Sequence, residues 1–392
     1  MLKNTLHIII FKITILILVV NIFASCSTNF NIKKIEKNRV LKNATLYLNQ
    51  KPITVTQSTC DRSQGNCHDY YSEGDYWWPD IKNPEGPYVR KDGLTNPNNF
   101  NAHRDAMIRF SQISGALGSA YIITHDKKFA IQLAKHLCAW FINENTKMNP
   151  NLLYAQAIKG VATGRGIGII DTVHLIEVVK AIQAIENSEA LSKQELNTIQ
   201  LWFSNYLTWL TTHEYGLAER DNGNNHSVCW TMQVTAFAKF INNQEMLIFC
   251  NNFYKKTLLP NQMAENGSFP LELNRTKPYG YSLFNLDVMT NLCQLLSTKK
   301  ENVFAYTTPD GKNIELGLKF MVPYIQDKKQ WPFQKDVMYW NEWPVRQSSL
   351  LFGGLALKNK KYLKLWKSLN ANFTSPEIIR NMPMRYPLLW LQ

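Results

Sequence analysis

Residues 102–141, AHRDAMIRFSQISGALGSAYIITHDKKFAIQLAKHLCAWF, decide the fold. Apolar side chains recur in this stretch at the spacing of one face of an α-helix. The positions that set this period are Met107, Phe110, Ile113, Leu117 and Tyr121, followed by Ala130, Leu133, Leu137, Trp140 and Phe141. The stretch therefore predicts two consecutive helices.

The same period continues through the rest of the chain. Further helical segments are predicted near residues 170–187, 193–212, 226–257, 280–298, 312–325 and 348–370. Short turns with Gly, Pro or Asn separate them, and strand signals are sparse. Because helices with short connections pack antiparallel, the sequence predicts an all-α fold of helical hairpins, arranged as a ring or as a solenoid.

The composition excludes several classes of protein. Of 392 residues, 45% are hydrophobic and 19% are charged, which excludes a disordered chain, a collagen-like repeat and a many-span membrane protein. The formal net charge of +13 favours an anionic partner, either nucleic acid, anionic lipid or acidic polysaccharide. The basic residues are dispersed rather than gathered in one stripe, which argues against nucleic acid.

The first 26 residues predict export. Lys3 precedes a mostly apolar run, Ile8–Val20, and small residues stand just before Cys26. The run is too short for a transmembrane helix, and the pattern is typical of a signal peptide whose lipobox is acylated at Cys26. A plain signal peptide with a chance cysteine is the alternative. We expect an exported bacterial lipoprotein of the outer membrane or periplasm, which contacts the membrane through its lipid anchor only.

One domain is predicted after the lipobox. Residues 27–68 are polar and rich in Asn and Lys, which indicates a tether and an irregular N-terminal arm. Residues 69–392 contain no Gly/Ser-rich or Pro-rich linker and form the predicted domain. It begins with an aromatic loop, residues 69–101, that shows neither a helical nor a strand period, and ordered loops of this length are usually functional.

Six cysteines follow Cys26, and only Cys60 and Cys67 invite pairing. They flank a short polar segment in a chain expected in an oxidising compartment, so the sequence allows a local disulfide between them. The other four lie in apolar helical stretches and are predicted to be buried thiols. No spacing of Cys and His matches a zinc motif, and we expect no metal and no cofactor.

Residues 221–227, DNGNNHS, open a long apolar helical run. Asn side chains cap helices, and the backbone N–H groups and positive dipole at a helix N-terminus favour a bound carboxylate. The same dipole favours a neutral imidazole at His226. Asn225 and His226 are therefore candidate contacts of a substrate carboxylate. The alternative is that the Asn residues are caps only and that His226 is a half-buried side chain without a chemical role.

Arg275 stands six residues before Tyr281 across a Pro/Gly turn, so the two side chains can converge on one point. A Tyr hydroxyl has a pKa near ~10 and accepts a proton at neutral pH only where nearby positive charge stabilises the phenolate. Arg275 and Lys277 could supply that charge. The alternative is an ordinary aromatic side chain packed beside a surface Arg.

Four short motifs together resemble the alginate lyase superfamily of helical-toroid polysaccharide lyases. They are Tyr76-Trp77-Trp78-Pro79, the TGRGIG segment 163–168, Asn224-Asn225-His226, and Arg275 with Tyr281-Ser282-Leu283-Phe284-Asn285. The resemblance covers roughly residues 65–392 and is closest to polysaccharide lyase family 38, with family 5 more distant. It implies a single incomplete (α/α) toroid of about six or seven helical hairpins.

The resemblance also implies β-elimination of a uronate-containing polysaccharide, with mannuronate-rich alginate as the first candidate. An ionised carboxylate makes the neighbouring C5–H a very poor acid, unless donors neutralise it and stabilise the developing enolate. By motif position, Asn225 and His226 contact the carboxylate and Arg275 adds positive charge. Tyr281 removes the C5 proton and protonates the departing O4. At guluronate, where these lie on opposite faces of the sugar, His226 acts as the base and Tyr281 as the acid.

Binding the rest of an anionic sugar chain needs stacking surfaces and cations. The candidates are Tyr76, Trp77, Trp78, His103, Arg104, Gln156, Arg165 and Arg346, with Tyr154 a weaker one. Core packing is the alternative for the Trp pair, and a structural hydrogen-bonding role is the alternative for Arg165. The glycines around Arg165 are not a dinucleotide fingerprint, because their spacing differs and no strand precedes them.

Two other functions stay open at this stage. A lyase of this kind could act on glucuronan or another uronan, because donors aimed at a carboxylate do not distinguish C5 epimers. A helical lipoprotein that captures glycans at the cell surface would share the anchor, the aromatic residues and the charge. In every case the expected partner is an anionic polysaccharide, and the expected state is a monomer.

Overall fold

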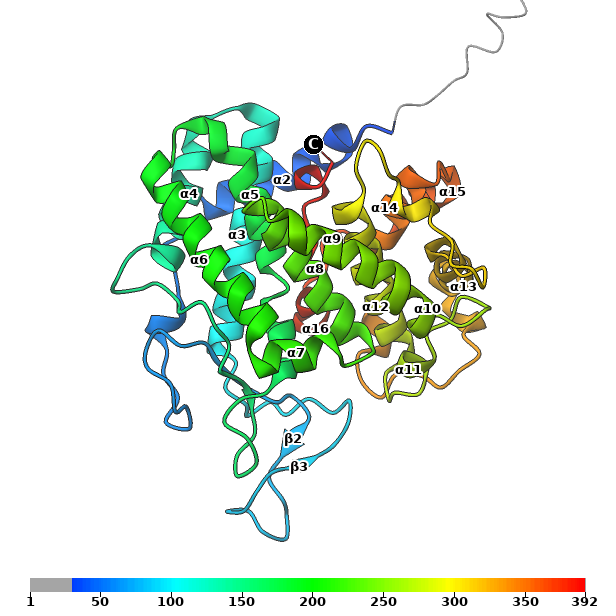
Figure 1. The fold of residues 1–392 in the computed structure, drawn as a ribbon, viewed down its shortest axis with the longest axis horizontal. Coiled ribbons are helices and arrows are strands. Elements are labelled where there is room, and N and C mark those ends of the chain that lie inside the picture. The colour runs from blue at the N-terminus through cyan, green and yellow to red at the C-terminus, as the bar shows by residue number, and fades with distance from the viewer. Residues whose placement is uncertain (1–29, 392) are drawn as a thin grey trace, which may run out of the picture. The chain divides into compact units, whose positions relative to one another are not determined.

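The computed structural model describes residues 30–391, in which helices dominate (Figure 1). The predicted signal peptide and Cys26 lie outside the described residues. The α-helices are α2 (Ile32–Tyr47), α3 (Ala102–Thr124), α4 (Lys127–Phe141), α5 (Leu175–Ile185), α6 (Lys193–Thr212), α7 (Glu214–Arg220), α8 (Asn225–Phe240), α9 (Gln244–Phe253), α10 (Leu259–Gln262), α11 (Pro270–Leu273), α12 (Pro278–Leu296), α13 (Ile314–Gln326), α14 (Ser348–Ala356), α15 (Lys360–Ser368) and α16 (Pro376–Arg380). None of these helices combines the length and the apolar character that crossing a membrane requires.

The long helices of residues 37–392 form an inner and an outer row. Along the inner row, α3 contacts α5, α5 contacts α8, α8 contacts α12 and α12 contacts α14. The outer helices α4, α6, α9, α13 and α15 pack on these inner helices. Inner and outer helices alternate along the chain, and the fold is the all-α toroid that the sequence resemblance implied. The described residues hold five such pairs, fewer than the six or seven expected, because α7, α10 and α11 are short.

Burial explains why the inner helices form. In α8 every residue from Ser227 to Ala238 is buried, as expected of a helix that neighbours cover on all sides. An aromatic cluster joins the two rows on the N-terminal side. The rings of Phe110 and Trp140 stack with their centroids 4.8 Å apart, and Phe141 lies 4.8 Å from Trp202.

Short strands organise the aromatic loop in front of α3. They are β1 (Tyr71–Glu73), β2 (Trp77–Trp78), β3 (Val89–Arg90) and β4 (Tyr154–Ala157). β1 pairs in parallel with β4, and β2 pairs antiparallel with β3. These pairings fix the positions of the residues between β1 and β2, which reach the site described below.

The segment 27–68, predicted to be irregular, contains helix α2. From Lys37 onward only two of its apolar side chains, Val40 and Ala44, are fully buried, which is too few for a helical period to be recognised. Contacts with the C-terminal segment stabilise this part of the helix instead. Arg39 donates to the carbonyl oxygen of Arg385 (2.7 Å), and Asn43 donates to the hydroxyl of Tyr386 (3.1 Å).

Two predicted helices are each divided in the structure. The segment 226–257 breaks after α8, where Asn242 has a φ of 59°, and the side chain of Asn243 then caps α9. The segment 348–370 breaks in the same way, since Lys358 has a φ of 54° and Asn359 caps α15. A left-handed residue followed by an Asn cap ends one helix and starts the next.

The disulfide that the sequence allows is not formed, since Cys60 and Cys67 are both free thiols. Hydrogen bonds hold the segment between them instead. Ser63 N donates to the carbonyl oxygen of Cys60 (2.9 Å), and Asn66 N donates to the carboxylate of Asp69 (2.8 Å). Of the four other cysteines, Cys229, Cys250 and Cys293 are buried as expected and Cys138 is half-buried.

Candidate active site

A cavity of about 480 Å³ brings together residues that are far apart along the chain. Its walls come from the aromatic loop, from the N-terminal ends of α8 and α12, and from α16. All four predicted catalytic residues line it, namely Asn225, His226, Arg275 and Tyr281. Four of the predicted binding residues line it too, namely Tyr76, Trp77, Gln156 and Arg165.

The N-terminus of α8 supplies the first wall. The side chain of Asn224 caps the helix by accepting a hydrogen bond from His226 N (2.9 Å). Asn225 instead donates to Glu272, from its backbone N (2.9 Å) and from its side-chain Nδ2 (2.8 Å). Burial raises the pKa of Glu272. Because an amide nitrogen carries two hydrogens, Asn225 is fixed in orientation and keeps one donor for a ligand.

His226 is paired with a buried carboxylate that the sequence did not reveal. Its Nδ1 lies 2.7 Å from Oε1 of Glu219, which stands on α7 and is fully buried. Burial raises the pKa of Glu219, and a positive charge on His226 lowers it. The pairing fixes the ring and leaves Nε2 as the nitrogen that can meet a ligand.

Tyr281 lies in the first turn of α12, and its hydroxyl faces two partners. The hydroxyl of Tyr76 is 2.5 Å away, and Nη2 of Arg275 is 3.4 Å away. The guanidinium carbon of Arg275 is 4.5 Å from the centre of the Tyr281 ring. Burial raises the pKa of Tyr281 well above its usual value, and the charge of Arg275 opposes this shift. The hydroxyl is therefore protonated in the resting site.

Arg275 is itself held by a carboxylate, Asp92, which sequence reasoning missed. Nη2 and Nε of Arg275 lie 3.0 and 3.2 Å from the two carboxylate oxygens. Although burial raises it, hydrogen bonds from Arg275 lower the pKa of Asp92 to about 2. The turn beside it requires glycine, because Gly93 has a φ of 76° and a Cβ there would lie 2.3 Å from Oγ1 of Thr276. Asp92 therefore orients Arg275 and offsets part of its charge.

The loop wall of the cavity carries Trp77 and Arg165. The guanidinium of Arg165 lies 5.8 Å from the centre of the Trp77 ring. Its Nε donates to the carbonyl oxygen of Gln156 (2.8 Å) and its Nη2 to the side-chain oxygen of Gln156 (3.3 Å). Within residues 30–391 no carboxylate lies at ion-pair distance from it. Burial lowers the pKa of Arg165 to about 10, so it stays charged at neutral pH and suits an anionic ligand.

Two predicted binding residues are buried behind the cavity wall. His103 accepts a hydrogen bond from Tyr71 N at Nδ1 (2.9 Å), and its Nε2 lies 2.8 Å from the carbonyl oxygen of Ser58. Arg104 forms an ion pair with Asp75 (2.7 Å). Both side chains hold the aromatic loop in place.

Trp78, Arg346 and Tyr154 do not line the cavity either. Nε1 of Trp78 donates to the carbonyl oxygen of Leu94 (2.9 Å), so its ring supports the loop. The guanidinium of Arg346 lies 4.4 Å from the ring centre of Trp366. Tyr154 lies in β4 and pairs with β1.

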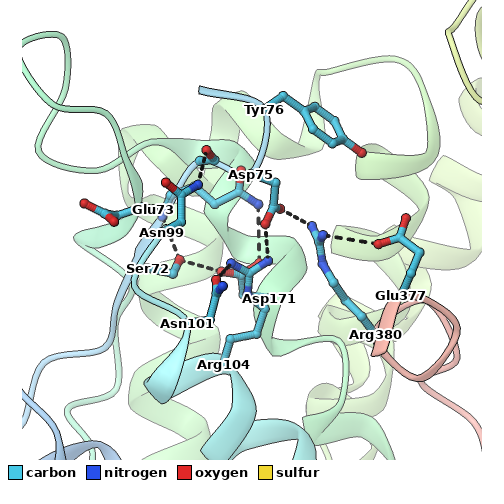
Figure 2. A network of polar contacts seen from close by, with 12 residues as sticks. Ser72, Glu73, Asp75, Tyr76, Asn99, Asn101, Arg104, Asp171, Glu377 and Arg380 are labelled. Atoms are coloured by element: carbon cyan, nitrogen blue, oxygen red, sulfur yellow. Dashed lines mark hydrogen bonds and ion pairs between the residues drawn. The ribbon is translucent and has the colours of Figure 1, made fainter. Parts of the chain in front are cut away.

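A buried charge network that sequence reasoning missed borders the cavity through Asp75, Glu377 and Arg380 (Figure 2). Figure 2 shows Arg380 of α16 between Asp75 and Glu377. Arg380 forms an ion pair with Asp75, and its Nη1 lies 3.7 Å from the carboxylate of Glu377. Glu377 also pairs with Lys277 (2.5 Å). Glu377 and Arg380 are neighbours on α16, but Lys277 and Asp75 come from distant parts of the chain, so no local pattern could reveal the network.

In the part of the chain that the structure describes, no three His, Cys, Asp or Glu side chains gather closely enough to hold a metal ion. The charged groups that reach the cavity are mainly cations, including Arg90, Arg165, Arg275 and Arg380. A cavity of this size and charge fits a short length of an anionic chain.

Comparisons with known proteins identify the family of the chain. The alginate lyase family model matches residues 54–331. An alginate lyase from Bacteroides ovatus of known structure is 30% identical, with a TM-score of 0.80 over 92% of this chain and 94% of that chain. Alginate lyase A1-III from Sphingomonas species A1 is 14% identical, with a TM-score of 0.54 over 90% of this chain and 94% of that chain, which shows the fold alone.

A variant of alginate lyase A1-III complexed with a tetrasaccharide has a TM-score of 0.57 and 13% identity, over 90% of this chain and 94% of that chain. No curated protein sequence matches the chain. The family model covers well over half of the chain, and the Bacteroides ovatus enzyme aligns over nearly all of it. The chain therefore belongs to the alginate lyase family and is a polysaccharide lyase.

Proposed function

We propose that this lyase cleaves mannuronate-rich alginate by β-elimination without a metal ion. The observation that carries the proposal is the convergence of a Tyr hydroxyl, an Arg and a helix N-terminus on one cavity. Tyr281, Arg275, Asn225 and His226 all line it, although they come from separate parts of the chain. These are the groups that elimination next to a carboxylate needs.

Neutralisation of the substrate carboxylate falls to Asn225, His226 and Arg275. Asn225 has one free amide hydrogen, because Glu272 takes only one. When Nδ1 holds the only ring proton of His226 and donates it to the carboxylate of Glu219, Nε2 is a base. When Nε2 has taken up a second proton, from water or from C5 of the sugar, Nε2 donates, and Glu219 can accept the proton of Nδ1. The buried Glu219 therefore lets His226 serve either role.

Tyr281 takes the C5 proton and returns it to O4 of the leaving sugar. One residue can do both at mannuronate, because the C5 proton and O4 lie on the same face of the ring. Because Tyr281 is protonated at rest, it first releases its own proton to water, and the charge of Arg275 stabilises the phenolate that remains. At guluronate His226 acts as the base and Tyr281 as the acid.

The remaining sugars bind along the loop wall. Trp77 offers a stacking surface, and Arg165 offers a cation without a carboxylate partner in residues 30–391. Both features suit a polymer with a carboxylate on each unit. Glucuronan is the alternative substrate, since glucuronate and mannuronate share the C5 configuration.

Incubation of the purified protein with polymannuronate, polyguluronate, glucuronan and hyaluronan tests the proposal. Each elimination leaves an unsaturated product that absorbs in the ultraviolet. We expect the fastest product formation from polymannuronate, and none from a Tyr281→Phe control. A higher kcat/KM for glucuronan than for polymannuronate would identify glucuronan as the substrate. Equal rates for the wild type and Tyr281→Phe would refute the mechanism.

We also propose that the mature chain is a monomeric lipoprotein anchored through Cys26. The lipobox-like sequence before Cys26 supports the anchor. In an expressing bacterium, a Cys26→Ala variant is expected to leave the membrane fraction. Retention of that variant in the membrane would refute the anchor.

A further inference from the structure

Lys277 and Glu377 form a buried ion pair directly behind Tyr281. Their nitrogen and oxygen atoms are 2.5 Å apart, and the side chains are only 4% and 7% exposed. Lys277 occupies the N-cap position of α12, the helix that carries Tyr281, whereas Glu377 lies in the short helix α16, far along the sequence. The pair thus joins the catalytic helix to the C-terminal segment, beyond the residues 54–331 that the family model matches.

The ammonium group of Lys277 is enclosed by aromatic rings. It lies 5.2 Å from the ring centre of Tyr76, 5.3 Å from that of Tyr281 and 5.2 Å from that of Tyr339. Water is therefore largely excluded around it, and charges interact more strongly there than at a surface. Although burial lowers it, the carboxylate of Glu377 holds the pKa of Lys277 above its usual value. Lys277 is charged throughout the neutral range.

A small void connects the pair to the Tyr. It has a volume of about 10 Å³, roughly that of one water molecule, and Lys277, Tyr281, Glu377 and Asp336 all border it. Lys277 does not line the large cavity, so it does not reach the sugar. Its influence on the reaction is electrostatic and passes through Tyr281 and Tyr76.

The other charged and titratable groups around Tyr281 are each tied to a partner. They are Tyr76 and Asp75 from the aromatic loop, Asp92, Arg275, His226 with Glu219, Arg380 of α16, and Asp336. Arg275 acts on Tyr281 from one side and is offset by Asp92. The positive charge of Lys277 acts on Tyr281 from the other side, and the carboxylate of Glu377 offsets part of that charge. Each cation beside the phenol thus has one carboxylate that limits its effect.

We propose that Lys277 and Glu377 are a positioning pair that sets the proton affinity of Tyr281, with Lys277 favouring the phenolate and Glu377 limiting that effect. The inference rests on the proposed role of Tyr281 as base and acid. It assigns to the pH dependence of the enzyme Lys277, which does not line the cavity, and Glu377, which borders both the cavity and the small void. Because the two charges have opposite signs, their removal must move the titration of Tyr281 in opposite directions.

The test measures the titration of Tyr281 in the free protein by NMR of ¹³Cζ-labelled tyrosine, with the signal assigned by its loss in Tyr281→Phe. Lys277→Met is expected to raise the pKa of Tyr281 by about one unit or more, and Glu377→Gln to lower it by a similar amount. The double variant is expected to fall between the single ones. The acidic limb of the kcat/KM profile should shift in the same directions.

Two control variants separate the electrostatic role from a structural one. Lys277→Arg keeps the charge and is expected to keep the titration within a few tenths of a unit of the wild type. Glu301→Gln removes the carboxylate of another Lys–Glu pair, formed with Lys255, and is expected to change nothing at Tyr281. Thermal unfolding of every variant verifies that it folds.

Shifts in the same direction for Lys277→Met and Glu377→Gln, or no shift in either, would overturn the inference. The NMR titration needs no turnover, so it stands apart from the proposed function. The titrations can shift as expected while the wild type releases no unsaturated product from any uronan. In that case the proposed function is refuted, but the effect of Lys277 and Glu377 on the proton affinity of Tyr281 still stands.

Discussion

The two walls of the cavity differ in how their charges are balanced. The helix wall consists of Asn225, His226, Arg275 and Tyr281, and the loop wall consists of Trp77 and Arg165. On the helix wall, three residues are each held by a carboxylate, in the pairs Asn225–Glu272, His226–Glu219 and Arg275–Asp92. On the loop wall, Arg165 has no such partner within residues 30–391. A paired group is fixed for chemistry, whereas an unpaired cation is available to an anion. Substitutions on the helix wall should therefore lower kcat, and those on the loop wall should raise KM.

The largest effect is expected from Tyr281→Phe. It removes the hydroxyl that carries the proton while leaving the ring in place, so kcat should fall at least about 1,000-fold on both polymannuronate and polyguluronate. KM should change little, because the phenol is assigned to the chemical step. Initial rates of unsaturated product measure both constants.

Tyr339→Phe is the matched control for that prediction. The ring of Tyr339 also lies against Lys277, but Tyr339 does not line the cavity. It should keep nearly full activity. If Tyr281→Phe kept more than about a tenth of the wild-type kcat, the helix wall would not carry the proton transfer.

A smaller and substrate-dependent effect is expected from His226→Ala. On polyguluronate it removes the base, and kcat should fall about 100-fold. On polymannuronate it removes one of three donors to the carboxylate, so the loss should be smaller. The ratio of kcat on polyguluronate to kcat on polymannuronate, in the variant and in the wild type, shows whether His226 acts as the base at guluronate.

Glu219→Gln sharpens this prediction. The amide keeps a hydrogen bond to Nδ1 of His226 but cannot take up a proton, so the loss on polyguluronate should be partial, about tenfold. An equal loss on both polymers for His226→Ala would mean that His226 only binds the carboxylate.

Arg165→Ala tests the loop wall. The expected result is a KM about tenfold higher with a nearly unchanged kcat, because the lost ion pair binds ground state and transition state alike. The effect should shrink at high salt, which screens the interaction in the wild type. Arg346→Ala is the matched control, since Arg346 packs on Trp366 away from the cavity. A lower kcat at constant KM would show instead that Arg165 takes part in the chemical step, as the residues of the helix wall do.

The sequence predicted the helix wall better than the loop wall, for a physical reason. Asn225 and His226 mark a helix start, and Arg275 precedes Tyr281 by less than two helical turns, so local rules place them. The helical period likewise predicted α3, α4 and α6 closely. These features depend on residues that are near in sequence.

What the sequence could not predict depends on long-range contacts. Glu272 and Asp92 become partners only when α11 and the aromatic loop meet the ends of α8 and α12. Glu219 is near His226 in sequence, but the two side chains meet only through the turn that joins α7 to α8. Helix α2 escaped notice because its contacts are with the C-terminal segment. The disulfide was inferred from the spacing of Cys60 and Cys67 alone, and hydrogen bonds hold that segment instead.

The adjacent residues Trp77 and Trp78 give the smallest expected effect and the finest test of the two walls. Successive residues of a strand point to opposite faces, so only one of the two rings in β2 can face the cavity. Trp77 lines the cavity beside Arg165, whereas Trp78 donates to Leu94 and lies under Lys91. Trp77→Ala should therefore raise KM about threefold to tenfold through lost stacking.

Trp78→Ala should leave KM unchanged and lower the melting temperature by a few degrees, because it removes a hydrogen bond and packing from the loop. The two variants carry the same substitution at neighbouring positions. A general loosening of the loop would therefore change KM and the melting temperature in both variants. Only a ring that contacts sugar gives a KM effect confined to Trp77. Equal KM values for the two variants would show that the aromatic part of the loop wall supports the fold and leaves binding to Arg165.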